Sequence, residues 1–132
     1  MKQINYLSSY LNLPAEIENS SNLTIIKTLN LVKSKIEELT SALKINKFAL
    51  ISMGSLVTQE MIITTEGKFL SDLDLIFVFQ STEENKFIEE KSLFIDNIRA
   101  LNTKITLEFS AMDISRYTHL YNKGCILSFR NS

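Results

Sequence analysis

Two aspartates, Asp72 and Asp74, stand at the start of an otherwise apolar stretch, residues 72–80 (DLDLIFVFQ). Carboxylates at the edge of an apolar strand are costly unless a partner compensates their charge. Because side chains alternate along a strand, both aspartates should point to the same face, close to each other. Mg²⁺ is a hard cation that proteins hold with one or two carboxylates plus substrate phosphates. The pair therefore predicts a divalent metal site.

A third acid and a Gly-Ser pair fit the same kind of site. Glu108 lies on the polar face of the alternating stretch 104–110 (KITLEFS) and is a candidate third oxygen ligand or base. Gly54 directly follows the apolar run 48–53 (FALISM). Its missing side chain leaves room for a phosphate to approach backbone N–H groups, and Ser55 adds a hydroxyl donor. We expect one element to hold metal and the other to hold phosphate.

The order of these motifs resembles the nucleotidyltransferase superfamily related to DNA polymerase beta. An apolar run ends in Gly54-Ser55, a variable connection follows, the run 71–75 (SDLDL) opens a second apolar stretch, and an acid stands on a third. The segment 120–127 (LYNKGCIL) resembles the short helix, glycine turn and closing strand that often follow the third acid in small members. Order, strand context and third acid together make the resemblance fairly specific.

The chain departs from the family pattern in three places. Many members read Arg-Gly where Thr58 and Gln59 stand, although Glu60 keeps its usual place. The connection between the Gly-Ser pair and the aspartates is longer than in the smallest members, and the third acid is Glu108 where Asp is commoner. Metal binding is still expected despite these departures. Substrate choice and the level of activity are the properties that the departures can change.

The resemblance implies transfer of a nucleoside monophosphate from a nucleoside triphosphate, most simply ATP, to a hydroxyl of a small molecule or protein. Two metal ions would stabilise the attacking and leaving oxygens of an in-line displacement, with Mg²⁺ expected and Mn²⁺ as the alternative. The implied catalytic residues and metal ligands are Asp72, Asp74 and Glu108. Glu108 would also help to deprotonate the acceptor hydroxyl. The implied nucleotide-binding residues are Gly54, Ser55 and Ser71, of which the first two would hold the β- and γ-phosphates.

A second function from a different class stays open at this point. The chain would then be a minimal nucleotidyltransferase-like binding or regulatory module, antitoxin-like, that acts with a partner protein. The missing Arg-Gly and the length of 132 residues favour the module, whereas the three acids favour the enzyme. For the enzyme, a homodimer or a separate partner protein is the expected way to complete the site, because the chain shows no obvious second domain to hold an acceptor.

Several other residues have types that can do chemistry but have simpler expected roles. Asp113 is a rival third acid, but it follows a predicted strand and is expected to cap the next helix. His119 stands alone on a short polar helix and is expected at the surface. Cys125, the single cysteine, fits a small buried side chain on a strand. The cations that could reach a triphosphate, but for which solvation is the simpler expectation, are Arg116, Lys123 and Arg130.

The elements that must position these residues follow from hydrophobic periodicity. Residues 20–44 predict a long amphipathic helix, capped near Ser21 or Asn22, whose apolar seam we assign to core packing. Strands are predicted at 48–53, 72–80, 104–110 and 125–129, and further helices at 81–102 and 113–122. The expected fold is α/β (α+β): a mixed central sheet of about four strands covered by helices on at least one face, similar to nucleotidyltransferases.

Length and composition indicate one domain, residues 1–132, with an N-terminal helical segment at 1–45 and a sheet core at 46–132. Hydrophobic residues at 45% and charged residues at 22% are close to globular averages. We find no apolar run near the ~18 residues of a membrane span, and the start of the chain is too polar for a signal peptide, so a cytoplasmic location is expected. The net charge of −1 argues against extended nucleic-acid binding.

Overall fold

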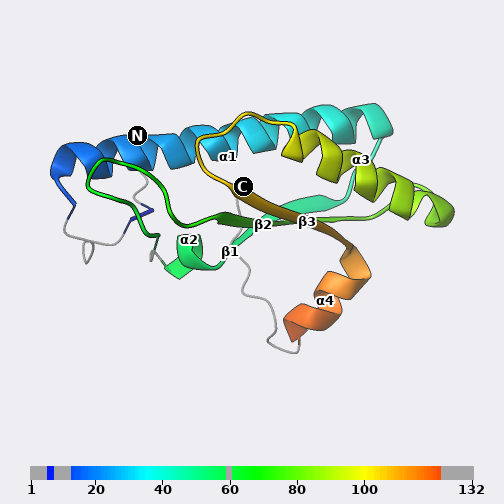
Figure 1. Cartoon of the computed structure of the whole chain (residues 1–132). Helices are drawn as coiled ribbons and strands as arrows, with labels where there is room; N and C mark the ends of the chain where they lie inside the picture. The colour runs from blue at the N-terminus through cyan, green and yellow to red at the C-terminus, as the bar shows by residue number, and fades with distance from the viewer. Residues whose placement is uncertain (1–5, 8–12, 59–60, 123–132) are drawn as a thin grey trace.

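The computed structural model describes residues 6–7, 13–58 and 61–122, and these form a mixed α+β fold (Figure 1). In chain order the elements are α1 (Ala15–Leu43), β1 (Phe48–Met53), α2 (Ser55–Thr58), β2 (Leu73–Phe79), η2 (Glu84–Lys86), α3 (Phe87–Arg99), β3 (Leu107–Asp113) and α4 (Ile114–Asn122). In the described part of the chain three strands form one sheet in the order β1-β2-β3. The strand expected at 125–129, which would have been the fourth, lies outside the described residues.

β2 is the middle strand of this sheet. It pairs antiparallel with β1 and parallel with β3. A parallel pair needs a crossover connection, and here η2 and α3 supply it between β2 and β3. Alternation along β2 divides its side chains between two faces. The core-facing set, each at most 1% exposed, is Leu73, Leu75, Phe77 and Phe79.

The core lies between this face of the sheet and the two long helices, α1 and α3 (Figure 1). Phe94 of α3 is fully buried, with its ring centroid 4.5 Å from that of Phe77 and 5.3 Å from that of Phe79. The buried apolar residues of α1 are Ile25, Leu29, Val32 and Ile36. Each large apolar side chain stabilises the fold by roughly 1.5–3 kcal/mol on burial. Within the described ranges no helix is both long and apolar enough to cross a bilayer.

α1 begins earlier than its sequence pattern predicts. Its first residue is Ala15, and Pro14 occupies the N-cap position without a side-chain cap. The predicted cap at Ser21 or Asn22 is therefore wrong, because both residues are buried inside the helix. The Asn22 side-chain oxygen accepts the Tyr6 N–H at 2.7 Å, so a tertiary contact uses the residue that looked like a cap.

β3 lies three residues further along the chain than the predicted stretch 104–110. Its pairing with β2 runs from Leu73 opposite Leu107 to Phe79 opposite Asp113. Ile105, which precedes the strand, is nevertheless fully buried. The alternating pattern therefore includes residues that pack against the core before strand pairing begins.

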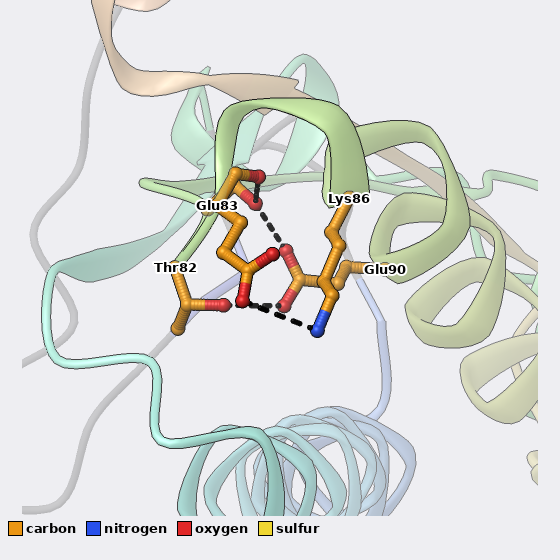
Figure 2. A network of polar contacts seen from close by, with 5 residues as sticks. Thr82, Glu83, Lys86 and Glu90 are labelled. Atoms are coloured by element: carbon orange, nitrogen blue, oxygen red, sulfur yellow. Dashed lines mark hydrogen bonds and ion pairs between the residues drawn. The ribbon is translucent and has the colours of Figure 1, made fainter.

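A buried carboxylate organises the junction between β2 and α3 (Figure 2). Glu90 is 6% exposed, and its two oxygens lie 2.5 Å from the Ser81 hydroxyl and 3.4 Å from the Thr82 hydroxyl. Lys86 forms an ion pair with Glu83 at 3.4 Å in the same turn. Hydroxyl donors compensate the burial of Glu90, so this cluster fixes the start of α3 at the end of β2 remote from Asp74.

Candidate active site

Three segments that are distant in the sequence meet where β1 ends and where β2 and β3 begin. Met53, the last residue of β1, pairs with Asp74 in the antiparallel register. Asp74 in turn pairs with Glu108 of β3 in the parallel register. The sheet therefore places Gly54, which directly follows Met53, on one side of Asp74 and Glu108 on the other side, at one end of the sheet.

Asp74 and Glu108 interact directly through their side chains. They occupy the face of the sheet opposite the helix-covered core, where Asp74 is half-buried and Glu108 is exposed. A hydrogen bond with Asp74, then the negative charge of Asp74, then desolvation hold the pKa of Glu108 above its ordinary value of 4.5. A hydrogen bond between two carboxyl groups requires one of them to carry a proton. The Glu108 carboxyl therefore binds a proton more readily than a separate glutamate would.

Gly54 brings its backbone against the Asp74 carboxylate. Its φ is +67°, in the left-handed region that glycine adopts without steric cost. A Cβ atom added at Gly54 would lie 2.5 Å from Asp74 Oδ2, closer than real side chains come. Ser55 then begins α2, which is a four-residue turn and so carries only a small dipole. The feature of this turn that matters for the site is the close approach of Gly54 to the Asp74 carboxylate, not the short helix that follows.

Asp72 and Ser71 lie just before this pair. Asp72 is half-buried and precedes the first ladder residue Leu73, whose N–H donates to the Thr106 carbonyl at 2.9 Å. The Ser71 hydroxyl accepts the N–H of Ile62 at 2.7 Å. Among the residues that the structure describes, no group of three or more His, Cys, Asp or Glu side chains is placed to hold a metal ion. The structure thus brings two of the three expected acids into contact.

The donor set of this pair suits a hard cation. Carboxylate oxygens are the ligands that Mg²⁺ prefers, and one or two carboxylates with substrate phosphates are its usual protein site. Asp74 and Glu108 supply two such groups on neighbouring strands. A cation placed between them would offset the negative charge of Asp74 that acts on Glu108.

Asp113 lies outside this site and caps α4. Its Oδ2 accepts the backbone N–H of Ser115 at 3.0 Å and also the Ser115 hydroxyl, so the expected cap is confirmed. Asp113 stands opposite Phe79, five residues along β3 from Glu108, a separation of about 16 Å at ~3.3 Å per residue. Asp113 is therefore too far from Glu108 to act as the third acid of this site.

Among the remaining sequence candidates, Arg116 alone has a side chain that the structure describes. Arg116 is exposed on α4. The residues whose side chains or whole positions lie outside the described part of the chain are Thr58, Gln59, Glu60, His119, Lys123, Cys125 and Arg130.

Sequence reasoning did not anticipate the contact between Gly54 and the Asp74 side chain. The available signal was a glycine directly after an apolar run. That signal indicates a turn, but the antiparallel register of β1 and β2 decides which residue the turn meets. Sequence reasoning also missed the exposed apolar pair Ile62 and Leu70, which precedes the aspartates.

Comparisons of the chain with protein-family models, with curated proteins and with solved structures find no match. The site is therefore interpreted from its own residues and their geometry.

Proposed function

We propose that the chain is a Mg²⁺-dependent nucleotidyltransferase. It would transfer a nucleoside monophosphate from a nucleoside triphosphate, most simply ATP, to a hydroxyl of a small molecule or a protein. The observation that carries the proposal is the contact of Asp74 with Glu108 on the neighbouring strand and with Gly54 on its other side. Support comes from the strand register, which brings the glycine after β1, the aspartate on β2 and the acid on β3 side by side.

Asp74 and Glu108 are the groups that would hold the ion. The resemblance adds Asp72 as a further ligand, and its part rests on the resemblance alone, because no three acids of the described residues are placed to share one ion. When bound, Mg²⁺ supplies positive charge that stabilises the phosphate oxygens of the substrate. Glu108 must be deprotonated to accept a cation. Metal affinity should therefore rise with pH through the raised pKa of Glu108.

Glu108 is also the proposed general base. Its exposed carboxylate can take the proton of the acceptor hydroxyl, and a raised pKa brings a carboxylate closer to the pH at which the reaction runs. The acceptor oxygen then bonds to the α-phosphorus. The bond from that phosphorus to the bridging oxygen breaks, and pyrophosphate leaves. Gly54 would admit phosphate beside Asp74, since a side chain there would occupy the space.

Mass spectrometry tests this proposal. The purified protein, alone and with candidate acceptors, is incubated with Mg²⁺ and each of the common nucleoside triphosphates in turn. We expect released pyrophosphate and an acceptor heavier by one nucleoside monophosphate. Glu108→Gln should keep much of the triphosphate affinity while the transfer rate falls by ~10²–10⁴-fold, the usual worth of general-base assistance. Transfer that is undiminished in Glu108→Gln would remove Glu108 from the reaction.

One observation favours a second candidate function, the binding or regulatory module that acts with a partner protein. In the described part of the chain Asp74 and Glu108 lack a third acid that completes a metal-ligand group. A module would depend on its outer surface, so that Leu23→Glu and Leu31→Glu on the exposed side of α1 should weaken the partner complex. Glu108→Gln should leave the affinity for that partner unchanged. The reverse result, in which Glu108→Gln weakens the complex and the α1 variants do not, excludes the module.

A further inference from the structure

A serine hydroxyl stands beside the carboxyl pair on the outer face of the sheet, which is the face opposite the core under α1 and α3. The ladder register assigns each residue of the three strands to one of the two faces. Within β1, β2 and β3, Ser110 is the only residue of the outer face that carries a hydroxyl. The others on this face are Ala49, Ile51, Met53, Asp74, Ile76, Val78, Glu108 and Met112.

The register fixes the position of Ser110 next to both carboxyl groups. Asp74 pairs with Glu108, and the next pair on the same face is Ile76 with Ser110. Ser110 is two residues from Glu108, which puts their Cα atoms about 7 Å apart at ~3.3 Å per residue. Because all of these residues lie inside β2 or β3, alternation along the strands determines the face to which each side chain belongs.

The Ser110 hydroxyl is accessible. Its side chain is exposed, and in the described part of the chain its hydroxyl has no hydrogen-bond partner. Two other hydroxyls near this end of the sheet differ from it. The Ser71 hydroxyl already accepts the Ile62 N–H at 2.7 Å, and Ser52 is buried on the core side of β1. Ser110 therefore combines a fixed position with a hydroxyl that can react.

We propose that Ser110 is an acceptor of the reaction, so that the chain transfers a nucleoside monophosphate to its own serine. This inference rests on the proposed function, because it requires a triphosphate whose α-phosphorus lies against Asp74 and Glu108. Ser110 Oγ forms a bond to the α-phosphorus. The bond from that phosphorus to the bridging oxygen breaks, and pyrophosphate leaves with the electron pair. The hydroxyl proton passes to the Glu108 carboxylate, directly or through one water molecule.

Transfer within one chain follows from the position of both groups on the same strand. β3 holds Glu108 and Ser110 at a fixed separation before any triphosphate binds. Such positioning makes a step within one molecule faster than the same step between two molecules. One accessible hydroxyl accepts one nucleotide, so each chain should be modified once. The attached group adds negative charge beside Asp74 and Glu108, and the modified chain should therefore bind a second triphosphate more weakly.

Intact-mass spectrometry of the full chain, after incubation with Mg²⁺ and each common nucleoside triphosphate, measures this transfer, and peptide mapping locates it. The wild type should gain one nucleoside monophosphate, on the peptide that contains Ser110. Ser110→Ala should gain none, and Ser110→Thr should recover part of the modification because it keeps a hydroxyl. Thr106→Ala is the matched control and should be modified like the wild type, since Thr106 is also two residues from Glu108 but precedes β3.

A mixing experiment tests whether transfer occurs within one chain. A tagged Asp72→Asn/Asp74→Asn chain keeps Ser110 but lacks two of the proposed metal ligands. When this chain is incubated with untagged wild type, only the wild type should be modified. Modification of the tagged chain would overturn transfer within one chain. Thermal melts of Ser110→Ala check its fold and should match the wild type, because the substitution removes one exposed oxygen.

The outcomes separate this inference from the proposed function. If thermal shifts show that the wild type binds no Mg²⁺-complexed triphosphate, the proposed function fails and the acceptor assignment fails with it. If the wild type binds a triphosphate but gains no mass, the acceptor assignment alone is overturned. The same holds if the nucleotide maps to another residue, such as Thr106, or if Ser110→Ala is modified as well as the wild type.

Discussion

The carboxyl groups of Asp74 and Glu108 determine how the metal-free site responds to pH. The pKa of Glu108 is raised in the folded protein above its ordinary value of 4.5. Between these two values the folded chain binds more protons than the unfolded chain, so the free energy of unfolding falls as pH rises through that window. The loss is complete above the folded pKa, where both carboxylates are charged and repel each other.

Glu108→Gln should remove this pH dependence. In metal-free buffer the variant should have the higher melting temperature at pH 7, since its amide can donate to Asp74 without adding charge. Thermal melts of wild type and variant from pH 4 to pH 8 measure the effect. Glu66→Gln, at an exposed carboxylate between the bridged residues Ile63 and Phe69, is the control and should follow the wild type. Melting curves for Glu108→Gln that run parallel to the wild type across the range would disprove this explanation.

Gly54→Ala should destabilise the protein and displace the Asp74 carboxylate. A left-handed conformation costs a residue with a side chain about 1–2 kcal/mol, and the new methyl would also collide with Asp74 Oδ2. Gly67→Ala is a matched control, because its φ is +87° while the nearest atoms to its added Cβ are 4.0 Å away on Ile17. Chemical denaturation should show a loss for both variants. Only Gly54→Ala should lose affinity for Mg²⁺-ATP. If Gly54→Ala and Gly67→Ala both keep that affinity, the contact between Gly54 and Asp74 has no role in binding.

At the scale of elements, the sequence could predict which stretches form strands and helices better than it could predict where they begin. The strand at 48–53 is confirmed as β1, and the predicted stretch 72–80 contains β2, because dense apolar runs that end in Gly54 or begin at Asp72 leave few alternatives. The start of α1 was missed because Asn22 binds the Tyr6 backbone, a contact with no local signature. β3 was shifted because the register with β2 decides which residues pair.

The cap of α4 gives a prediction at this scale. Asp113→Ala should lower the free energy of unfolding by about 1 kcal/mol, the usual worth of a side-chain N-cap, since Asp113 accepts the Ser115 N–H. Asp113→Asn should retain most of the stability because asparagine also caps well. Neither variant should change Mg²⁺-ATP affinity, given the distance along β3 to Glu108. A loss of that affinity in the stable Asp113→Asn variant would return Asp113 to the site.

At the scale of the whole molecule, the sheet separates structural from chemical roles. One face carries the apolar core under α1 and α3 (Figure 1). The opposite face carries Asp74 and Glu108. The two ends of β2 differ as well, with Gly54 and the carboxyl pair at its start and the Glu90 cluster beyond its end (Figure 2). The sequence could suggest Asp74, Glu108 and Gly54 as a set, but only the order of the strands brings them together. The sequence pattern predicts Asp72 on the same face as Asp74, because side chains alternate along a strand. Asp72 lies before the first residue of β2, however, and alternation does not determine where its side chain points.

The central claim is that these carboxylates bind a metal-complexed triphosphate. The most direct test is the thermal shift that Mg²⁺-ATP produces in wild type and in Asp72→Asn/Asp74→Asn. A ligand at 100 times its dissociation constant adds about 2.7 kcal/mol to the stability of the protein that binds it. We predict a clear rise in melting temperature for the wild type and none for the double variant, whose metal-free fold should stay intact because the substitutions relieve like-charge repulsion. An equal shift in both proteins would contradict the assignment of Asp72 and Asp74 to the site.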